Sequence, residues 1–489
     1  MTQTDSHFNR LLLMVTKAGV YSLLFIPLLY SSKLIYSHNS AKTYFFYAII
    51  EITSVCFLWL ISRAPRWRPT SSLITKMVAV YIGIIIITSL FGIDPTYSFW
   101  GSIDRMSGSL TWLHLGLAFL LVTSILRTKD DWVKFFSFSV IVAIVVSAIH
   151  LLSLGGTQIV PEARSGATFG NSSFFAVYIL FNFFFALSII ALTSDKKLKR
   201  LGICSSVLFA ITIFKTPAIA IQYTLMGGGI LLLVLLLIAK GNTILKKRIG
   251  LVLISLLILA FSSGVILIFQ PNSSLRIKMI ELSSPTRFVL WNMAWEGIKE
   301  RPFFGLGLES FGYVAIKHYN PCLGSRVCGN EMWFDRAHNK ILDVWIESGL
   351  VGLLAYLAIF AGAIYQIWDT RQKNILSPAT KAILSAALIS YFVQNLTALD
   401  TLSSSFFWLL IIAFVSVLSQ EAPASSSTKT LSPILPILFT IFLPISLFFF
   451  IVQPIRGNMA YGRVINATSV PNRLEAYQQA TTLSPLGID

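Results

Sequence analysis

The sequence predicts an all-α polytopic membrane protein, and two observations carry that prediction. First, 55% of the 489 residues are hydrophobic and only 12% are charged, whereas soluble domains carry about a quarter charged residues. Second, apolar runs recur along the whole chain. Runs of about 17–25 residues are long enough to cross a hydrocarbon core about 30 Å thick.

These runs predict about 12–13 transmembrane helices. The helices on either side of Lys215–Pro217 form either a hairpin or one broken helix. The expected spans are residues 11–30, 44–62, 73–92, 110–126, 132–154, 168–192, 200–216, 218–239, 249–269, 340–368, 379–397, 403–420 and 433–453.

The net charge of +17 is explained by topology and does not indicate a nucleic-acid partner. Lysine and arginine gather in every second connection, and cytoplasmic loops of membrane proteins carry such an excess. We therefore expect the N-terminus in the cytoplasm and residues 270–337, with the tail after 453, outside. The basic clusters begin at Arg63, Arg127, Lys196, Lys240 and Arg371.

The segment 270–337 is the longest connection between predicted spans, and long connections are usually functional or disordered. Its stretch "SSPTRFVLWNMAWEGIKERP" predicts an amphipathic helix, because Phe288, Trp291, Trp295 and Ile298 follow helical spacing. Two tryptophans on one face favour the membrane–water interface. A glycine-rich turn, "GLGLESFG", follows. The outer loop is therefore expected to be partly helical.

Two further expectations concern organisation. Residues 1–453 form the transmembrane bundle with its outer loop, and residues 454–489 form an external helical tail that resembles the start of a repeat domain. Cys322 and Cys328 share the outer segment "CLGSRVC". A disulfide between them is expected if that compartment is oxidising.

Four polar groups gather on the predicted outer side. They contain Asp104 and Arg105, then Arg164 and Asn171, then Arg287, and finally Arg336, His338 and Asn339. Charged side chains near membrane depth are costly and therefore favour a function. Each group also has a structural interpretation: Arg105 pairs with Asp104, Arg164 pairs with Glu162 or reaches lipid headgroups, Arg287 anchors at the interface, and His338 caps a helix.

A second polar set follows His338 along the chain. Asn339, Asp343 and Glu347 are spaced four residues apart and share one helix face. That face must meet protein or water and not lipid, and we interpret it as a framework that supports the site.

Taken together, the outer groups suit a lipid diphosphate. Arginine binds phosphate oxygens bidentately and keeps its charge. A histidine beside it can accept a proton near neutral pH. The apolar bundle wall can hold a long lipid. No spacing typical of a metal site is present.

Three stretches resemble the O-antigen ligase family of integral-membrane glycosyltransferases. They are "RSGATFGNSSFFAVYIL", "TRFVLWNMAWEGIKERPFFGLGLESF" and "AHNKILDVWIESGLVGLL". The resemblance implies a glycosyltransferase C-like fold in the bacterial cytoplasmic membrane with an outward-facing site. It also implies transfer of a glycan from an undecaprenyl-diphosphate carrier to a hydroxyl of a glycan, lipid or protein acceptor, with no metal and no cofactor.

The same resemblance assigns roles to residues. His338 falls on the family's motif histidine and is the expected base that activates the acceptor. Arg164 and Arg287 are expected near the carrier diphosphate, with Arg105 and Arg336 as further candidates from their position. Direct attack would invert the anomeric carbon. One departure stands out: Gly227 occupies the place where many members carry an arginine.

Two other functions share some of these features. A polymerase that joins lipid-linked repeat units carries the same motifs. A transporter or flippase is also polytopic, but such proteins often show inverted repeats and broken helices near the midplane. Here the polar groups lie at one face, which favours an enzyme.

Overall fold

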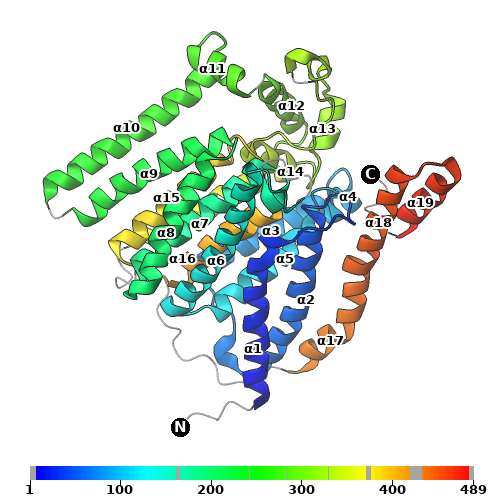
Figure 1. The fold of residues 1–489 in the computed structure, drawn as a ribbon, viewed down its shortest axis with the longest axis horizontal. Helices are drawn as coiled ribbons and strands as arrows, with labels where there is room; N and C mark the ends of the chain where they lie inside the picture. Colours follow the sequence, from blue (N-terminus) through cyan, green and yellow to red (C-terminus); the bar gives the residue numbers. More distant parts are fainter. Residues whose placement is uncertain are drawn as a thin grey trace.

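The structure is a computed structural model that describes residues 7–160, 166–241, 243–283, 285–328, 330–369, 376–418 and 432–483. Every regular element in these ranges is helical, which confirms the predicted all-α class (Figure 1). The first half contains α1 (His7–Ser22), η1 (Leu23–Leu28), α2 (Ser40–Arg63), η2 (Pro65–Trp67), α3 (Leu73–Leu90), α4 (Pro95–Trp100), α5 (Ser109–Ile125), α6 (Lys129–Leu154), η3 (Ala167–Phe169), α7 (Ser172–Leu192), α8 (Lys196–Phe214) and α9 (Ile219–Lys240).

The second half holds the outer segment and the last membrane helices. Its elements are α10 (Ile244–Phe269), α11 (Ser274–Ser283), α12 (Thr286–Glu300), α13 (Phe311–Lys317), η4 (Pro321–Gly324), η5 (Arg326–Cys328), α14 (Lys340–Trp368), α15 (Pro378–Gln394), α16 (Leu402–Leu418), α17 (Ile434–Leu447), η6 (Phe448–Val452), α18 (Gln453–Asn466) and α19 (Val470–Leu483).

Each predicted span coincides with a helix, but the helices differ in how well they suit a membrane. Among the described residues, nine are long and apolar enough to cross one. The other four predicted spans are α5, α8, α15 and α16. Three of these have 17 residues, and α8 begins with several cations. Lys215 caps the end of α8 and Ala218 precedes α9, so the chain forms two separate helices here, and α9 packs mainly against α15.

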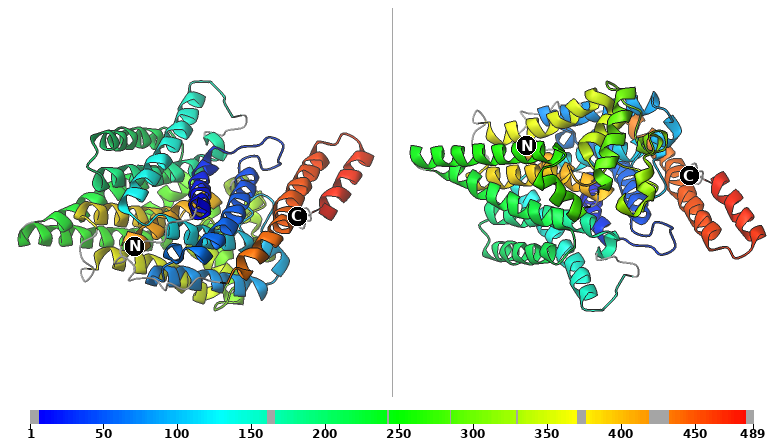
Figure 2. Two further views of the ribbon diagram at one scale, coloured as in Figure 1. Left: turned by 90° about the horizontal axis from the view of Figure 1, so that it is seen from below. Right: turned by 90° about the horizontal axis from the view of Figure 1, so that it is seen from above.

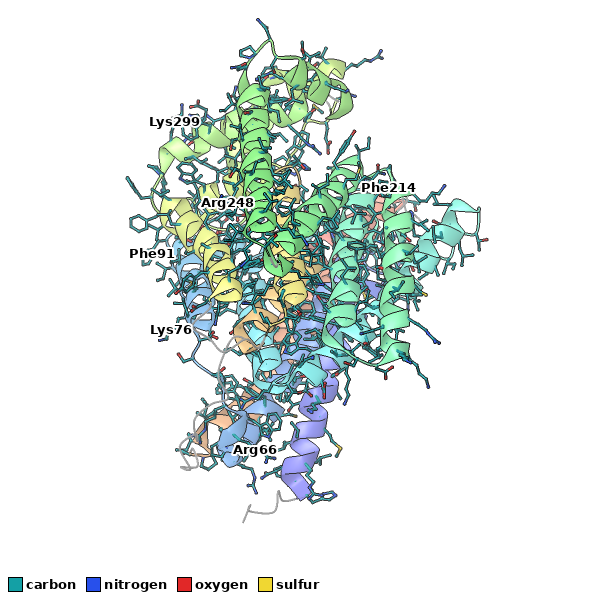
Figure 3. All side chains as sticks on the ribbon, turned by 90° about the vertical axis from the view of Figure 1, so that its left-hand side faces the viewer. Arg66, Lys76, Phe91, Phe214, Arg248 and Lys299 are labelled. Atoms are coloured by element: carbon teal, nitrogen blue, oxygen red, sulfur yellow. A yellow bond between two sulfur atoms is a disulfide. The ribbon has the colours of Figure 1, made fainter. Side chains whose placement is uncertain are left out.

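The bundle has two chemically different ends. At one end, the Arg63 side chain donates to Asn9 at 3.1 Å, and Arg127 donates to the carbonyl of Arg68 at 2.6 Å. Figure 3 shows Arg66 and Lys76 toward this end and Lys299 toward the other. At the opposite end, the backbone of Lys340 donates to Asn395 at 2.8 Å. Several predicted cytoplasmic clusters therefore lie away from the outer loop.

Two helix pairs project from opposite sides of the bundle (Figure 2). On one side α9 packs against α15 and carries α10. Gly250 is the buried residue of α10, and its leucines and isoleucines are largely exposed. Such a helix is stable in lipid, where exposed apolar surface has no cost. On the other side α18 and α19 form a hairpin.

One continuous helix runs from Ile434 to Asn466 and includes residue 453. Its π-helical turn η6 joins α17 to α18. The predicted division at 453 therefore coincides with an element boundary inside one continuous helix. The existence of a separate tail domain stays a prediction.

The outer segment has a small hydrophobic core of its own. Leu290, Met293 and Ile298 of α12 pack with Phe311 and Val314 of α13. Trp291 is buried, whereas Trp295 is 48% exposed. The predicted interfacial face of this helix is therefore mainly a protein contact. Cys322 and Cys328 are joined by a disulfide, as expected for an oxidising compartment.

The helix α14 is interrupted at Gly349, which has φ +66° and ψ −172°. The interruption exposes backbone groups that the glycine-rich segment satisfies. Leu306 and Gly307 donate to the carbonyls of Ile346 and Glu347 at 2.7 and 2.9 Å. Leu350, just past the break, donates to the carbonyl of Pro302 at 2.8 Å. The outer loop and the following membrane helix are thereby hydrogen-bonded into one unit.

Substituting Gly349 by alanine is expected to destabilise the protein strongly. A Cβ there would lie 2.2 Å from the backbone of Phe303, at a positive φ. Strained φ and overpacking each cost about 1–3 kcal/mol. The expected result is a lower thermal unfolding midpoint in detergent for Gly349→Ala.

Gly227→Ala is the matched control, because a Cβ at Gly227 meets nothing within 4 Å. Alanine also favours a helix over glycine by about 1 kcal/mol. Equal midpoints for the two variants would contradict this account of the break.

Candidate functional site

His338 lies in the turn that leads into α14. Its backbone has φ +54°, which is unusual for a residue other than glycine. Two neighbours hold this turn. The Asn339 side chain accepts from the backbone of Ile341 at 3.0 Å and caps the helix. The Asp343 carboxylate accepts from the backbone of Ala337 at 2.8 Å.

The imidazole of His338 is half-buried beside the ring of Phe334, with 6.1 Å between ring centroids. Within the described ranges, no protein group accepts from it or donates to it. The helix cap is therefore Asn339 and not His338, so the structural interpretation of the histidine does not apply. Its ring nitrogens are available to a substrate.

Arg336, two residues before His338, is held in place by buried carboxylates. Arg336 donates to Glu309 and lies 3.6 Å from Glu347, and all three side chains are at most 8% exposed. The backbone of Glu309 also donates to the Glu347 carboxylate at 3.2 Å. One cation between two buried carboxylates offsets much of the cost of burying each charge.

A second ion pair lies nearer the surface. Arg105 donates to both carboxylate oxygens of Asp335, at 2.7 and 3.3 Å, and lies 3.4 Å from Asp104. Burial acts to raise the pKa of Asp335, but the hydrogen bonds and charge of Arg105 outweigh it and lower that pKa to about 2. Asp335 is therefore ionised at neutral pH. The expected pairing of Arg105 with Asp104 exists, but Asp335 is the bidentate partner.

The charges around His338 favour its neutral form. Burial is the main cause that lowers the pKa of His338 to about 4. The positive charges of Arg287, Arg105 and Arg336 act in the same direction, and the negative charge of Asp335 opposes them. At neutral pH the imidazole is therefore unprotonated and able to accept a proton.

Arg287 differs from the two other described arginines of the predicted site. It lies at the start of α12 and is half-buried. Among the described residues no carboxylate pairs with it. Burial lowers its pKa from the ordinary guanidinium value. A half-buried cation without a carboxylate suits an anion supplied from outside.

The remaining predicted residues have mainly structural positions. Asn171 caps α7 by accepting from Ser173 at 2.8 Å. Asp343 and Glu347 are 2% and 5% exposed, so the polar stripe faces protein as expected. Gly227 lies in α9 with open space around it. Arg164, with its proposed partner Glu162, lies outside the described residues.

Sequence reasoning missed two carboxylates. Glu309 sits inside the glycine-rich turn and has φ +65°, and it binds Arg336. Asp400 lies 3.6 Å from Lys340 and accepts from Tyr391 at 2.7 Å. The sequence contained a signal for each residue: both are single carboxylates between apolar segments, and a carboxylate in that position needs a cationic partner. Across the described residues, no three histidine, cysteine or acidic side chains are arranged to hold a metal ion.

Comparison with known proteins adds an independent observation. Residues 183–357 match the family described as O-Antigen ligase. This range runs from within α7 to within α14 and includes Arg287, Glu309 and His338. Arg105 and Asn171 lie outside it.

Curated relatives cover part of the chain. A putative polysaccharide ligase of Rickettsia conorii is 27% identical over 27% of this chain and 31% of its own length. The teichuronic acid biosynthesis protein TuaE of Bacillus subtilis is 22% identical over 52% of each chain. A putative polysaccharide ligase of Rickettsia felis is 23% identical over 46% of this chain and 53% of its own. The chain thus spans from about a third to about half of the length of these relatives.

Removing the buried guanidinium is expected to destabilise the site. Arg336→Met leaves Glu309 and Glu347 buried without a cation, and breaking a buried pair in this way costs about 3–5 kcal/mol. The measurement is the unfolding midpoint in detergent without any donor. The double variant Glu309→Gln, Arg336→Met is expected to recover part of the loss. A double variant no more stable than the single one would contradict a charge-based explanation.

Proposed function

We propose that this chain, whose residues 183–357 match the O-Antigen ligase family, belongs to that family and transfers a preassembled glycan from an undecaprenyl-diphosphate carrier to an acceptor hydroxyl. The reaction would take place at the outer face of the cytoplasmic membrane. The observation that carries the proposal is the environment of His338: among the described residues, its neutral imidazole has no hydrogen-bond partner and the nearby Arg287 has no carboxylate partner. Nine apolar helices in the described part of the chain support a multi-pass membrane protein in which a lipid carrier is available.

His338 would act as the general base. A base must be unprotonated and within hydrogen-bond reach of the proton that it removes. With a pKa of about 4, the imidazole is neutral at pH 7. As the acceptor oxygen forms its bond to the anomeric carbon, its proton passes to His338. The bond from that carbon to the diphosphate oxygen breaks, and the configuration is inverted.

Arg287 would hold the leaving group. A diphosphate gains negative charge as it departs, and a guanidinium placed there stabilises that charge. Arg336 is already bound by Glu309, and Arg105 by Asp335. Their carboxylate partners compete with a diphosphate, so we assign them the support of the His338 turn. Arg164, in the stretch that resembles the family, remains a second candidate for the diphosphate.

Asn339, Asp343 and Glu347 would position the base. Asn339 and Asp343 bind the backbone on the two sides of His338. Glu347 binds the backbone of Glu309, which in turn binds Arg336. These residues act through the histidine and need not contact the substrate.

Replacing the base is expected to abolish transfer without unfolding the protein. General bases contribute about 10²–10⁴-fold to rate, so His338→Ala is expected to lose at least 100-fold in glycan transfer. The assay uses purified protein in detergent with a lipid-linked donor and analyses the glycan product. His318→Ala is the matched control, since that histidine binds Glu300 on the outer segment.

Three outcomes decide between functions. Transfer retained by His338→Ala would refute its role as base. A growing lipid-linked polymer as the product would indicate a polymerase. Transfer by the wild-type protein in detergent excludes a function limited to transport, since no compartments exist there.

Replacing Arg287 is expected to change two measurements. Arg287→Gln is expected to raise the donor KM by about tenfold or more, since a charge-assisted hydrogen bond contributes about 1.5–3 kcal/mol. It also removes a positive charge that lowers the pKa of His338. The acid limb of kcat/KM, which reports the free enzyme, is expected near pH 4 in the wild type and at higher pH in the variant.

The control for that variant is Arg326→Ala, which removes an exposed cation of the same outer segment. Activity is also measured after return to pH 7, so that acid unfolding is separated from titration. An unchanged donor KM together with an unmoved acid limb would place the diphosphate elsewhere.

A further inference from the structure

A cleft of about 830 Å³ opens beside the Arg105–Asp335 pair. Its walls come from α4, the turn that contains Glu309, α13, residues 331–335 and α18. The described segments that meet here are therefore far apart in sequence. Asp335 lines the cleft and lies three residues before His338. The cleft thus adjoins the turn that carries the proposed base.

Aromatic side chains line much of this cleft. Trp333 and Tyr313 are 58% and 41% exposed, and the Trp333 ring lies over Gly312. Tyr97 of α4 and Tyr461 of α18 line it from other sides. Exposed aromatic rings with a polar edge are typical of recognition surfaces, because the ring face covers apolar C–H groups and the polar edge stays hydrated.

The charged side chains of the lining are mostly acidic. Five carboxylates line the cleft: Asp94, Asp104, Glu309, Glu331 and Asp335. Arg105 is the one lining cation among the described residues, and Asp335 binds it. Lys317 lies beside Tyr313, but it is bound to Glu300 at 2.8 Å. The cleft therefore has a negative potential that opposes phosphates and carboxylates.

One hydroxyl in the wall has no partner. Ser310 is 4% exposed, and its Oγ has no hydrogen bond within the described part of the chain. Buried polar groups are normally satisfied by protein, water or ligand. Ser310 also lines the cleft. Because this Oγ is enclosed in the wall, it belongs to the polar lining and is not itself a contact point for an occupant.

We propose that this cleft binds the acceptor, and that the acceptor is a saccharide without carboxylate or phosphate groups at the end that enters. The proposal rests on the proposed function and adds the class of acceptor. Aromatic rings cover the apolar faces of sugar rings. Ionised carboxylates only accept hydrogen bonds, and sugar hydroxyls or amino groups donate them.

Charge separates the acceptor from the donor. The donor carries a diphosphate, and like charges placed together cost affinity. The acidic cleft opposes that group, whereas the half-buried Arg287 attracts it. The two substrates therefore approach His338 through surfaces of opposite charge. An acceptor hydroxyl that extends from the cleft beyond Asp335 reaches the turn that contains His338.

A binding experiment tests the cleft without catalysis. The full-length protein in detergent is applied to an array of bacterial envelope oligosaccharides that includes neutral, amino-sugar, uronic acid and phosphorylated members. Wild-type protein is expected to bind neutral or amino-sugar glycans. Trp333→Ala and Tyr313→Ala are each expected to weaken that binding at least tenfold.

The matched controls are Trp295→Ala and Tyr319→Ala. These residues are 48% and 42% exposed on the outer segment and do not line the cleft. Their binding is expected to equal that of the wild type. Absence of any bound glycan, binding only to anionic glycans, or equal losses in the controls would each overturn the proposal.

Three further arms complete the test, and the first separates this proposal from the proposed function. His338→Ala protein is expected to bind the same glycans as the wild type, so a failure of the base hypothesis leaves the binding result intact.

Glu331→Lys is expected to admit uronic acid glycans that the wild type rejects. In transfer assays Trp333→Ala is expected to raise the acceptor KM and leave the donor KM unchanged. A rise confined to the donor KM would overturn the assignment to the acceptor.

Discussion

The interruption of α14 at Gly349 is the constraint on which the site depends. A continuous helix would use its own carbonyls, and the outer segment would have nothing to bind. The break frees the carbonyls of Ile346 and Glu347 for Leu306 and Gly307. Irregular backbone in a membrane protein is tolerated where other protein groups satisfy it, and here the segment 302–307 does so.

That docking determines where Glu309 lies. Glu309 follows Gly307 by two residues, and its backbone donates to the Glu347 side chain. Its carboxylate then binds Arg336, two residues before His338. Positive φ at both Glu309 and His338 shows that the chain accepts unfavourable local geometry on each side of this contact. Such geometry persists only where surrounding contacts determine it, and it gathers at functional sites.

The same contacts divide the arginines by role. Arg336 and Arg105 neutralise carboxylates that shape the site, and Arg287 is left without one among the described residues. This division gives the region two electrostatic surfaces, an acidic cleft and a cationic helix start. A reaction between an anionic lipid-linked donor and an acceptor without anionic groups suits such a separation, because the acidic cleft repels the donor diphosphate and the arginine attracts it.

Much of the fold followed from the chain alone. Apolar runs predict helices wherever they are long enough, since an unsatisfied backbone group costs several kcal/mol in lipid. The predicted outer loop is partly helical, and the two cysteines that share it are joined by the disulfide expected for an oxidising compartment. Asp343 and Glu347 also face inward. The sequence could predict that they share a helix face, because residues four apart in a helix lie on the same side.

The sequence by itself determined the helices, their approximate bounds and the polar residues worth testing. Tertiary structure decided which of these residues are paired. Neither Glu309 nor Asp335 is near its partner in sequence, and a break in α14 cannot be seen in a hydropathy pattern. Ion pairs depend on distances of a few ångströms between segments hundreds of residues apart, as with Arg105 and Asp335. Only the folded chain fixes those distances, so only the fold distinguishes Arg105 and Arg336, which bind carboxylates, from Arg287, which has none among the described residues.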